Sequence, residues 1–187
     1  GIDTSIEWKR KEANQGEFIV AVTIKDAKGM QDLISSVDQR PDNLKGRIKI
    51  DIFGEGPMEN ELKEKTATLK LENSIQFKGS SPDLPNLFKD YSYLIQPTYM
   101  ECFSLSILES LTANVPVVTT NVGGNGEIIF EGQNGFIFKA GDIRSLATII
   151  EKILQRELKI KKDVSILIKQ EFTLQKMVEE HLKLLPC

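Results

Sequence analysis

The sequence has little of the chemistry that marks disulfide-stabilised, metal-binding or membrane-spanning proteins. Its 187 residues include two cysteines, Cys102 and Cys187, and a single histidine. Two cysteines cannot build a disulfide framework, and no cysteine, histidine and carboxylate cluster has metal-ligand spacing, so we expect no bound metal. No apolar run approaches the roughly 20 residues of a membrane-spanning helix, and no secretory signal is present. We expect a cytoplasmic protein, whose full-length form would contact the inner face of a membrane only peripherally.

The sequence also lacks a large excess of either charge. Its 24 basic and 27 acidic residues leave a formal net charge of −3. This balance argues against nucleic acid, or an anionic membrane surface, as the main partner. A chain of this length can bury about 70% of its unfolded surface around one core, so it needs no covalent staple.

Residues 1–16 are polar and charged without periodicity, which predicts a linker or approach segment. The sequence opens on Gly1 rather than methionine. We therefore expect a piece of a longer protein in which residues 17–187 form one domain.

From residue 17 onward, predicted strands alternate with predicted helices. The strands are expected at 17–23, 47–54, 74–79, 92–98, 116–120 and 136–138. The helices are expected at 28–40, 58–70, 84–91, 106–113, around 128, at 143–154 and at 171–185. This alternation predicts an α/β fold, a Rossmann-like, doubly wound parallel sheet of about six strands with helices on both faces. Ligands bind such sheets beyond the carboxyl ends of the strands.

The segment 97–111, "PTYMECFSLSILESL", begins where the fourth predicted strand ends. Its turn therefore lies at the binding edge, and the start of its helix would offer the free amides of residues 104–107 to a phosphate or pyrophosphate. Glu101 and Glu109 have two interpretations each. Glu109 fits a capping box with Ser106, and Glu101 fits a solvated turn carboxylate. Alternatively, both carboxylates accept paired hydrogen bonds from the vicinal hydroxyls of a ribose or a hexose.

Residues 101–109, "ECFSLSILE", resemble the E-x7-E signature of a family of retaining glycosyltransferases, the glycosyl transferases group 1. These enzymes have two Rossmann domains, the GT-B architecture. Residues 97–129 resemble the wider family pattern of Glu-x-Phe-Gly, Gly-x-Pro-Val-Val and Val-Gly-Gly-x-x-Glu. "IDIFGEGPMENEL" and "SIQFKGSSPDLPNLF" upstream, and "FEGQNGFIF" and "AGDIRSLATII" downstream, are also similar to family segments. The resemblance covers about residues 18–185, in order.

The resemblance implies that this chain is the C-terminal, donor-binding half of such an enzyme, without its N-terminal acceptor domain. In that case Glu101 is the catalytic-site residue that contacts the donor sugar hydroxyls, and Glu109 holds the ribose diol. The backbone amides of Phe103, Ser104 and Leu105 would meet the sugar and the distal phosphate.

Lys28 matches the family lysine that neutralises the diphosphate, although a lysine at a helix start is often only a surface residue. The sequence departs from the family at the partner arginine, which falls at about Thr23, and at the preceding glycine, which falls at Val22. One phosphate contact is therefore missing, or it is supplied by Lys25.

The nucleoside base is expected near the second and third strand ends. Gly54 and Gly56 would let that turn pass close to the base, and Ser80 or Ser81 would meet the base edge. Without the resemblance, the two glycines indicate only a tight turn with positive φ.

The resemblance implies transfer of a hexosyl unit from a UDP- or GDP-linked sugar to a hydroxyl of a glycan or glycolipid, without metal or other cofactor. The expected setting is bacterial surface polysaccharide synthesis, such as capsule, O-antigen or lipopolysaccharide, and we expect the fragment alone to be inactive. One alternative is a degenerate nucleotide-binding module that acts with a partner, because the arginine is missing. Another is a GT-B sugar-nucleotide epimerase, whose acid and base residues "ECFSLSILE" does not supply.

Overall fold

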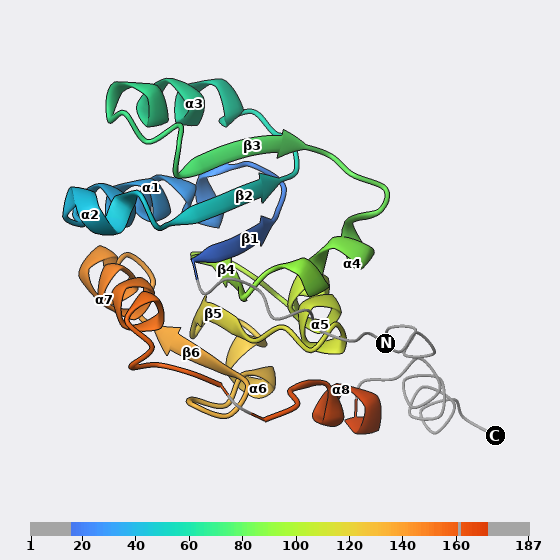
Figure 1. Ribbon diagram of the computed structural model, residues 1–187. Coiled ribbons are helices and arrows are strands. Elements are labelled where there is room, and N and C mark those ends of the chain that lie inside the picture. The colour runs from blue at the N-terminus through green and yellow to red at the C-terminus, as the bar shows by residue number, and fades with distance from the viewer. Residues whose placement is uncertain (1–15, 161, 172–187) are drawn as a thin grey trace.

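The computed structural model describes residues 16–160 and 162–171 and contains one six-stranded, all-parallel sheet (Figure 1). The strand order is β3-β2-β1-β4-β5-β6. The strands are β1 Glu17–Ala21, β2 Lys49–Phe53, β3 Ile75–Gly79, β4 Tyr93–Gln96, β5 Val117–Thr120 and β6 Gly135–Phe138. This sheet confirms the predicted fold class.

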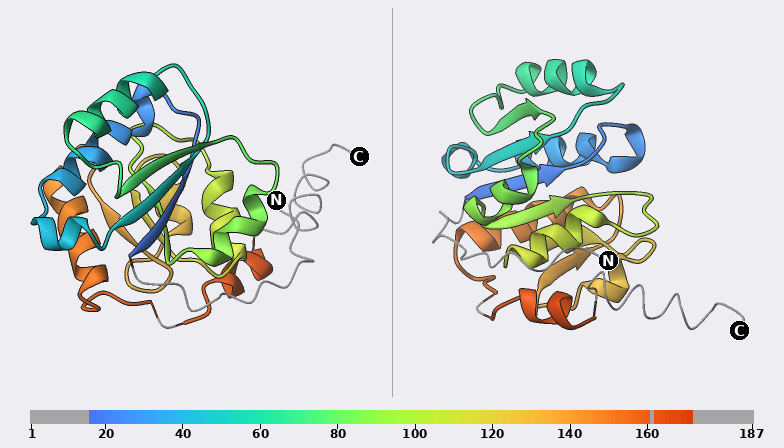
Figure 2. Two further views of the ribbon diagram at one scale, coloured as in Figure 1. Left: turned by 45° about the horizontal axis from the view of Figure 1, so that its top comes forward. Right: turned by 90° about the vertical axis from the view of Figure 1, so that its right-hand side faces the viewer.

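Helices cover both faces of the sheet (Figure 2). They are α1 Met30–Asp38, α2 Asp42–Lys45, α3 Glu59–Thr68, α4 Leu84–Leu87, α5 Leu105–Thr112, α6 Asn125–Ile128, α7 Ile143–Leu154 and α8 Ser165–Glu171. Helix α1 packs beside α3 and α7 on one face, and α5 packs beside α8 on the other. Within the described ranges, no helix combines the length and apolar character needed to cross a bilayer.

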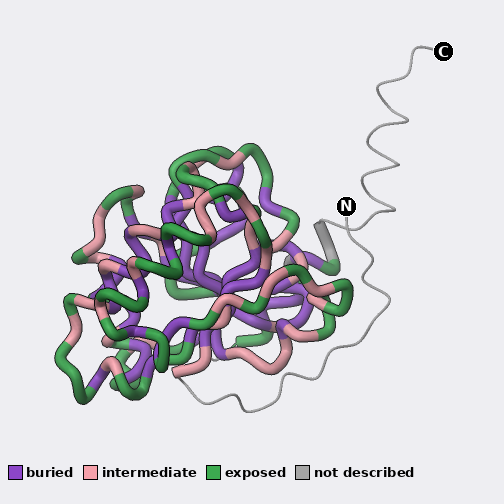
Figure 3. Tube along the Cα trace, turned by 90° about the horizontal axis from the view of Figure 1, so that it is seen from above, coloured by how far each residue is buried: buried purple, intermediate pink, exposed green. Residues whose placement is uncertain are grey.

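The core lies along the sheet because the central strands are nearly continuous apolar runs. In β4 and β5 every residue is buried, as expected for strands covered on both faces. Strand β3, at the edge, instead alternates between more and less buried positions. Figure 3 shows the buried residues gathered in the interior of the chain trace and the exposed residues at its periphery.

Several predicted helix boundaries are confirmed by specific contacts. The Asp142 carboxylate accepts a hydrogen bond of 3.0 Å from the Ser145 amide and caps α7. Asn114 adopts the expected left-handed conformation after α5, with φ of 60°.

Other boundaries differ from the sequence prediction. The first predicted helix is interrupted by Gly29, whose φ of 68° separates a 3₁₀ turn at Asp26–Lys28 from α1. The short helix α2 was not predicted, and the helix expected at 84–91 divides into α4 and a 3₁₀ turn at Phe88–Asp90. Residues 1–15 of the predicted linker 1–16, and all but the first residue of the predicted final helix 171–185, lie outside the described residues.

The order of the chain reverses between β1 and β4, which are neighbours in the sheet. One crossover from β1 leads outward to β2, while β4 begins the other half of the sheet. Such a reversal opens a crevice at the carboxyl ends of the two strands. The loop after β1 and the loop after β4 therefore meet at this edge.

Candidate functional site

The loops that follow β1 and β4 are bound directly to each other. The Tyr99 amide and the Thr98 hydroxyl donate hydrogen bonds of 2.8 and 3.0 Å to the Ala27 carbonyl. Gly29 lies so close to the second loop that a Cβ there would be 2.0 Å from the Pro97 carbonyl oxygen. A glycine is therefore required for these two loops to approach.

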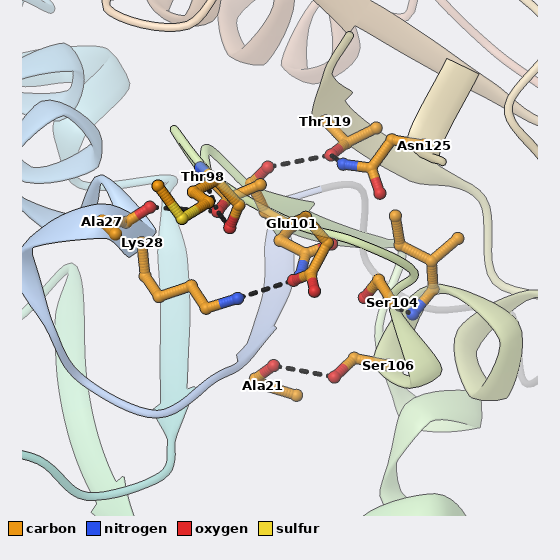
Figure 4. A network of polar contacts seen from close by, with 12 residues as sticks. Ala21, Ala27, Lys28, Thr98, Glu101, Ser104, Ser106, Thr119 and Asn125 are labelled. Atoms are coloured by element: carbon orange, nitrogen blue, oxygen red, sulfur yellow. Dashed lines mark hydrogen bonds and ion pairs between the residues drawn. The ribbon is translucent and has the colours of Figure 1, made fainter. Parts of the chain in front are cut away.

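Lys28 and Glu101, predicted separately from their resemblance to family positions, form an ion pair across these loops (Figure 4). The Lys28 Nζ atom lies 2.6 Å from Glu101 Oε2, and the two side chains are only 13% and 16% exposed. Gln96, the last residue of β4, donates a further hydrogen bond of 3.2 Å from Nε2 to the same carboxylate oxygen. Two donors thus share one oxygen of Glu101.

The glycine-rich loop after β5 supports the backbone of Glu101. Gly123 has a φ of 52°, and a Cβ there would lie 1.6 Å from the Glu101 carbonyl oxygen. The Gly124 amide donates a hydrogen bond of 2.9 Å to the carbonyl of Cys102. The position of Glu101 therefore depends on three loops of the sheet edge.

Helix α5 begins one turn away from this pair, and Ser104 is its N-cap residue. The Ser104 hydroxyl accepts a hydrogen bond of 3.3 Å from the Ile107 amide. The predicted capping box with Ser106 at the cap is wrong, because Ser106 is already inside the helix and its hydroxyl donates to the Ala21 carbonyl at 2.9 Å (Figure 4).

The expectation of free amides at residues 104–107 is also corrected, because the Ile107 amide is bonded to Ser104. The amides of Leu105 and Ser106 are first-turn donors, for which the helix itself supplies no acceptor. Ser104 is buried, whereas the side chains of Phe103 and Leu105 are exposed beside the helix start.

Glu109 lies one turn after Ser106 and on the same face of α5, since residues three apart are neighbours on a helix. It is half-buried, and its carboxylate makes no hydrogen bond or ion pair with any described residue. Burial raises its pKa above the ordinary value of 4.5. Glu109 is therefore a partly desolvated acceptor that no described side chain satisfies.

A cleft of about 350 Å³ opens beside Ser106, where β1, β2 and β3 end. Its lining consists of Ala21, Val22, Thr23, Phe53, Gly54, Glu55, Ser80, Ser81, Leu84 and Ser106. The cleft brings together Gly54, Ser80 and Ser81, as predicted. None of these lining residues is basic, and they include Val22 and Thr23, the positions at which the family resemblance predicts a glycine and an arginine.

Gly54 and Gly56 are required by the protein's own backbone. Gly54 has a φ of 128°, and a Cβ at Gly54 or Gly56 would lie 1.8 or 2.1 Å from the carbonyl oxygens of Val22 or Ile24. The turn after β2 therefore packs directly on the chain that leaves β1. Gly56 does not line the cleft, so contact with a nucleoside base stays a prediction for both glycines.

Three polar residues near the site carried no role in the sequence prediction. Glu55 accepts a hydrogen bond of 3.3 Å from the Ser80 amide. Gln96 contacts Glu101, and buried Asn125 donates to Thr119 at 3.1 Å. Gln96 could have been recognised from the sequence, because it is a polar residue at the end of an otherwise apolar strand. Among the described residues, no group of three or more His, Cys, Asp and Glu side chains is arranged to hold a metal ion.

Comparison with known proteins gives a family match along most of the chain. The family described as "Glycosyl transferases group 1" matches residues 3–171. The chain is 26% identical over 160 residues to the glycogen synthase of Mycobacterium tuberculosis, covering 82% of this chain and 38% of that protein. It is 29% identical over 160 residues to the capsular polysaccharide biosynthesis glycosyltransferase CapM of Staphylococcus aureus, covering 83% and 41%.

The architecture also matches solved structures. Anabaena Alr3699/HepE, crystallised in complex with UDP and glucose, is similar with a TM-score of 0.77 and 25% sequence identity, covering 91% of this chain and 49% of that chain. The chain therefore spans less than half the length of these relatives.

Proposed function

This chain belongs to the glycosyl transferases group 1 family, and from that premise we propose that it is the donor-binding half of a retaining glycosyltransferase. The whole enzyme would transfer a hexosyl unit from a nucleoside-diphosphate sugar to a hydroxyl acceptor. The missing N-terminal domain would carry the acceptor, a glycan or glycolipid of a bacterial surface polysaccharide.

The observation that carries this proposal is the Lys28–Glu101 ion pair at the crevice between β1 and β4. The Lys28 ammonium, which would serve the diphosphate, and the Glu101 carboxylate, which would accept hydrogen bonds from sugar hydroxyls, lie 2.6 Å apart, just before the first turn of α5. The partial positive charge of that helix end favours an anionic group. The cleft lined by Gly54, Ser80 and Ser81 then offers space for the nucleoside.

The proposed mechanism consists of orienting the donor and stabilising charge on the leaving group. The diphosphate lies against the Leu105 and Ser106 amides with Lys28 beside it. Glu101 accepts hydrogen bonds from the sugar hydroxyls, and Glu109 accepts them from the ribose diol. As the glycosidic bond breaks, the sugar gains oxocarbenium character and the diphosphate gains negative charge, which Lys28 and the helix start stabilise without a metal ion.

The relatives support a nucleotide sugar as the ligand class. HepE was crystallised with UDP and glucose, and CapM is named for capsular polysaccharide biosynthesis. Glycogen synthase is also named for making a polysaccharide. These names describe the relatives, and their chemistry agrees with the charges and hydroxyl acceptors of the present site.

Isothermal titration calorimetry with UDP, GDP, UDP-glucose and GDP-mannose tests the proposal. We expect weak binding of at least one nucleoside diphosphate by this chain, and tighter binding of the corresponding sugar nucleotide. We also expect little sugar transfer by the chain alone and robust transfer only with the N-terminal domain attached. Binding of none of these ligands would contradict the proposal.

A second candidate function is a nucleotide-binding module that has lost catalysis and acts with a partner. The observation in its favour is the cleft itself, because Val22 and Thr23 line it and none of its lining residues is basic. This module would bind the nucleoside diphosphate and its sugar form equally well. The same titrations therefore separate the two candidates.

A further inference from the structure

Gln96 is an unusual residue for its place in the fold. It ends β4, a central strand whose other residues are Tyr93, Leu94 and Ile95, and all four are buried. The Gln96 side chain is only 2% exposed. A buried amide is unfavourable unless its polar atoms find partners, so an apolar residue would be the simpler choice for packing alone.

The Gln96 amide is oriented toward Glu101. Its Nε2 group donates to Glu101 Oε2 at 3.2 Å, whereas its Oε1 atom is buried and finds no hydrogen-bond partner among the described residues. The opposite orientation of the amide would place Oε1 against the carboxylate and cause repulsion. The contact with Glu101 is therefore what fixes this side chain.

The backbone around Gln96 is also held in place. Its carbonyl accepts a hydrogen bond of 2.9 Å from the Thr119 hydroxyl. Thr119 in turn accepts one from Asn125, which lies beside it (Figure 4). The Gln96 donor therefore belongs to a strand that is hydrogen-bonded to its neighbour, β5. Lys28, the other donor, lies in a 3₁₀ turn, and its ammonium group reaches Glu101 at the end of a long side chain with several rotatable bonds.

A bound sugar nucleotide would affect the Lys28–Glu101 and Gln96–Glu101 contacts differently. Under the proposed function, Lys28 serves the diphosphate and so gives up some or all of its bond to Glu101. The Gln96 amide is buried, and within the described residues its Nε2 group donates only to Glu101. We propose that Gln96 is a positioning residue that keeps Glu101 aimed at the donor sugar when Lys28 engages the diphosphate.

The proposal rests on the proposed function and is tested by separating the sugar from the nucleotide. Gln96→Met keeps a similar length and removes the N–H donors. Calorimetry would compare UDP with UDP-glucose and GDP with GDP-mannose for the parent and variant chains. We expect the tightening contributed by the sugar to fall about tenfold, as for loss of one hydrogen bond to a charged group, with nucleoside diphosphate binding unchanged.

Thermal unfolding distinguishes positioning from a structural role. Gln96→Met removes a donor to Glu101, which Lys28 still pairs in the free chain, and also removes an unpaired buried carbonyl. These two effects oppose each other, so the melting temperature should stay close to that of the parent. Thr66→Val is the matched control, since Thr66 is equally buried but its hydroxyl, in the described part of the chain, bonds only to the Leu62 carbonyl within α3. We expect this control to leave the contribution of the sugar unchanged.

The outcomes that overturn the inference are distinct. Equal sugar-dependent tightening in parent and Gln96→Met, or parallel loss of UDP and UDP-glucose binding with a lower melting temperature, would refute positioning by Gln96. If the parent chain binds neither UDP-glucose more tightly than UDP nor GDP-mannose more tightly than GDP, both the positioning role of Gln96 and the proposed glycosyltransferase function are refuted. If Gln96→Met fails to fold, Gln96→Leu decides by the same criteria.

Discussion

The two sides of the crevice are built differently. On one side, the loops after β1 and β4 are closed on each other by the Lys28–Glu101 pair and by hydrogen bonds to Ala27. On the other side, the turns after β2 and β3 line an open cleft that contains Ser80 and Ser81 from these turns, Ser106 from α5 and no basic residue. A ligand that binds the first side must replace existing contacts between protein groups. A ligand that binds the second side enters a cleft that is already open. We call these the closed side and the open side.

This difference separates stability from affinity. Residues of the closed side already have partners in the free protein, so their loss should reduce the free energy of unfolding as well as binding. Glu109, which has no such partner among the described residues, faces the opposite situation. Its loss should reduce ligand affinity alone.

The largest effect is expected from breaking the closed side at Lys28. Lys28→Met leaves the largely buried Glu101 carboxylate with only the Gln96 amide as a partner. We expect a loss of about 3 kcal/mol in the free energy of unfolding, the lower end of the range for breaking buried ion pairs, measured by urea denaturation. The control is Lys63→Met, whose pair with Glu59 is more exposed and should contribute less than about 0.5 kcal/mol. Equal losses in both variants would remove the distinction between the two sides.

Glu109→Gln tests the carboxylate on α5 that has no partner among the described residues and does not line the cleft of the open side. We expect nucleoside diphosphate affinity to fall about ten- to a hundredfold, because a charge-assisted hydrogen bond to the ribose is lost. Titration calorimetry measures this change. The exposed Glu61→Gln on α3 is the matched control and should leave affinity unchanged.

Stability should change in the other direction in Glu109→Gln. Because burial raises the Glu109 pKa in the folded chain, the unfolded chain ionises at lower pH, and the folded chain loses stability as the pH rises above 4.5. Glu109→Gln should therefore be at least as stable as the parent at neutral pH, with the difference vanishing on the acid side. Lower stability at neutral pH would indicate a structural role for this carboxylate.

A smaller effect is expected from Tyr99→Phe, on the closed side. The Tyr99 hydroxyl donates to Asp32 at 2.5 Å, and its removal leaves a nearly buried carboxylate without that donor. We expect a loss of about 1.5 kcal/mol in urea denaturation. Tyr91→Phe is the control, because Tyr91 donates to Asp51 away from Glu101. Both variants should lose stability, but only Tyr99→Phe should weaken sugar-nucleotide binding.

Alkaline pH gives a second measurement on Tyr99. The hydrogen bond to Asp32, followed by burial, raises the Tyr99 pKa from 10.0 to about 12. The folded chain therefore keeps the phenol neutral, and this contribution to stability declines as the pH rises from 10.0 to about 12. The part of the alkaline destabilisation that Tyr99 causes should be absent in Tyr99→Phe.

The smallest effect is expected at the helix start between the two sides. Ser104→Ala removes the N-cap of α5 and should lower the free energy of unfolding by about 1 kcal/mol.

The coupling between Ser106 and Glu109 is a separate test. Because Ser106 does not form a capping box, the stability changes of Ser106→Ala and Glu109→Gln should add within about 0.5 kcal/mol in a double-mutant cycle. A larger coupling would restore the capping-box interpretation.

Sequence patterns predicted the fold well, because alternating apolar strands and amphipathic helices leave few arrangements other than a covered parallel sheet. Lys28 and Glu101 were each proposed from family resemblance, but their contact was not. It depends on the adjacency of β1 and β4, which no local pattern encodes. The cap of α5 was misplaced for a similar reason. Ser104 and Ser106 both fit a cap locally, and the distant Ala21 carbonyl is what occupies the Ser106 hydroxyl.

The adjacency of β1 and β4 also has a consequence for how the protein acquires its binding capacity. Phe18 pairs with Tyr93 in the sheet. The two strands are therefore far apart in the sequence, and the chain between them contains β2 and β3. Nonlocal pairings of this kind are slow to form, because chain entropy is lost before contacts repay it. Recovery of nucleotide binding after dilution from urea should therefore follow the slowest refolding phase, with earlier intermediates rich in secondary structure but inert toward ligand.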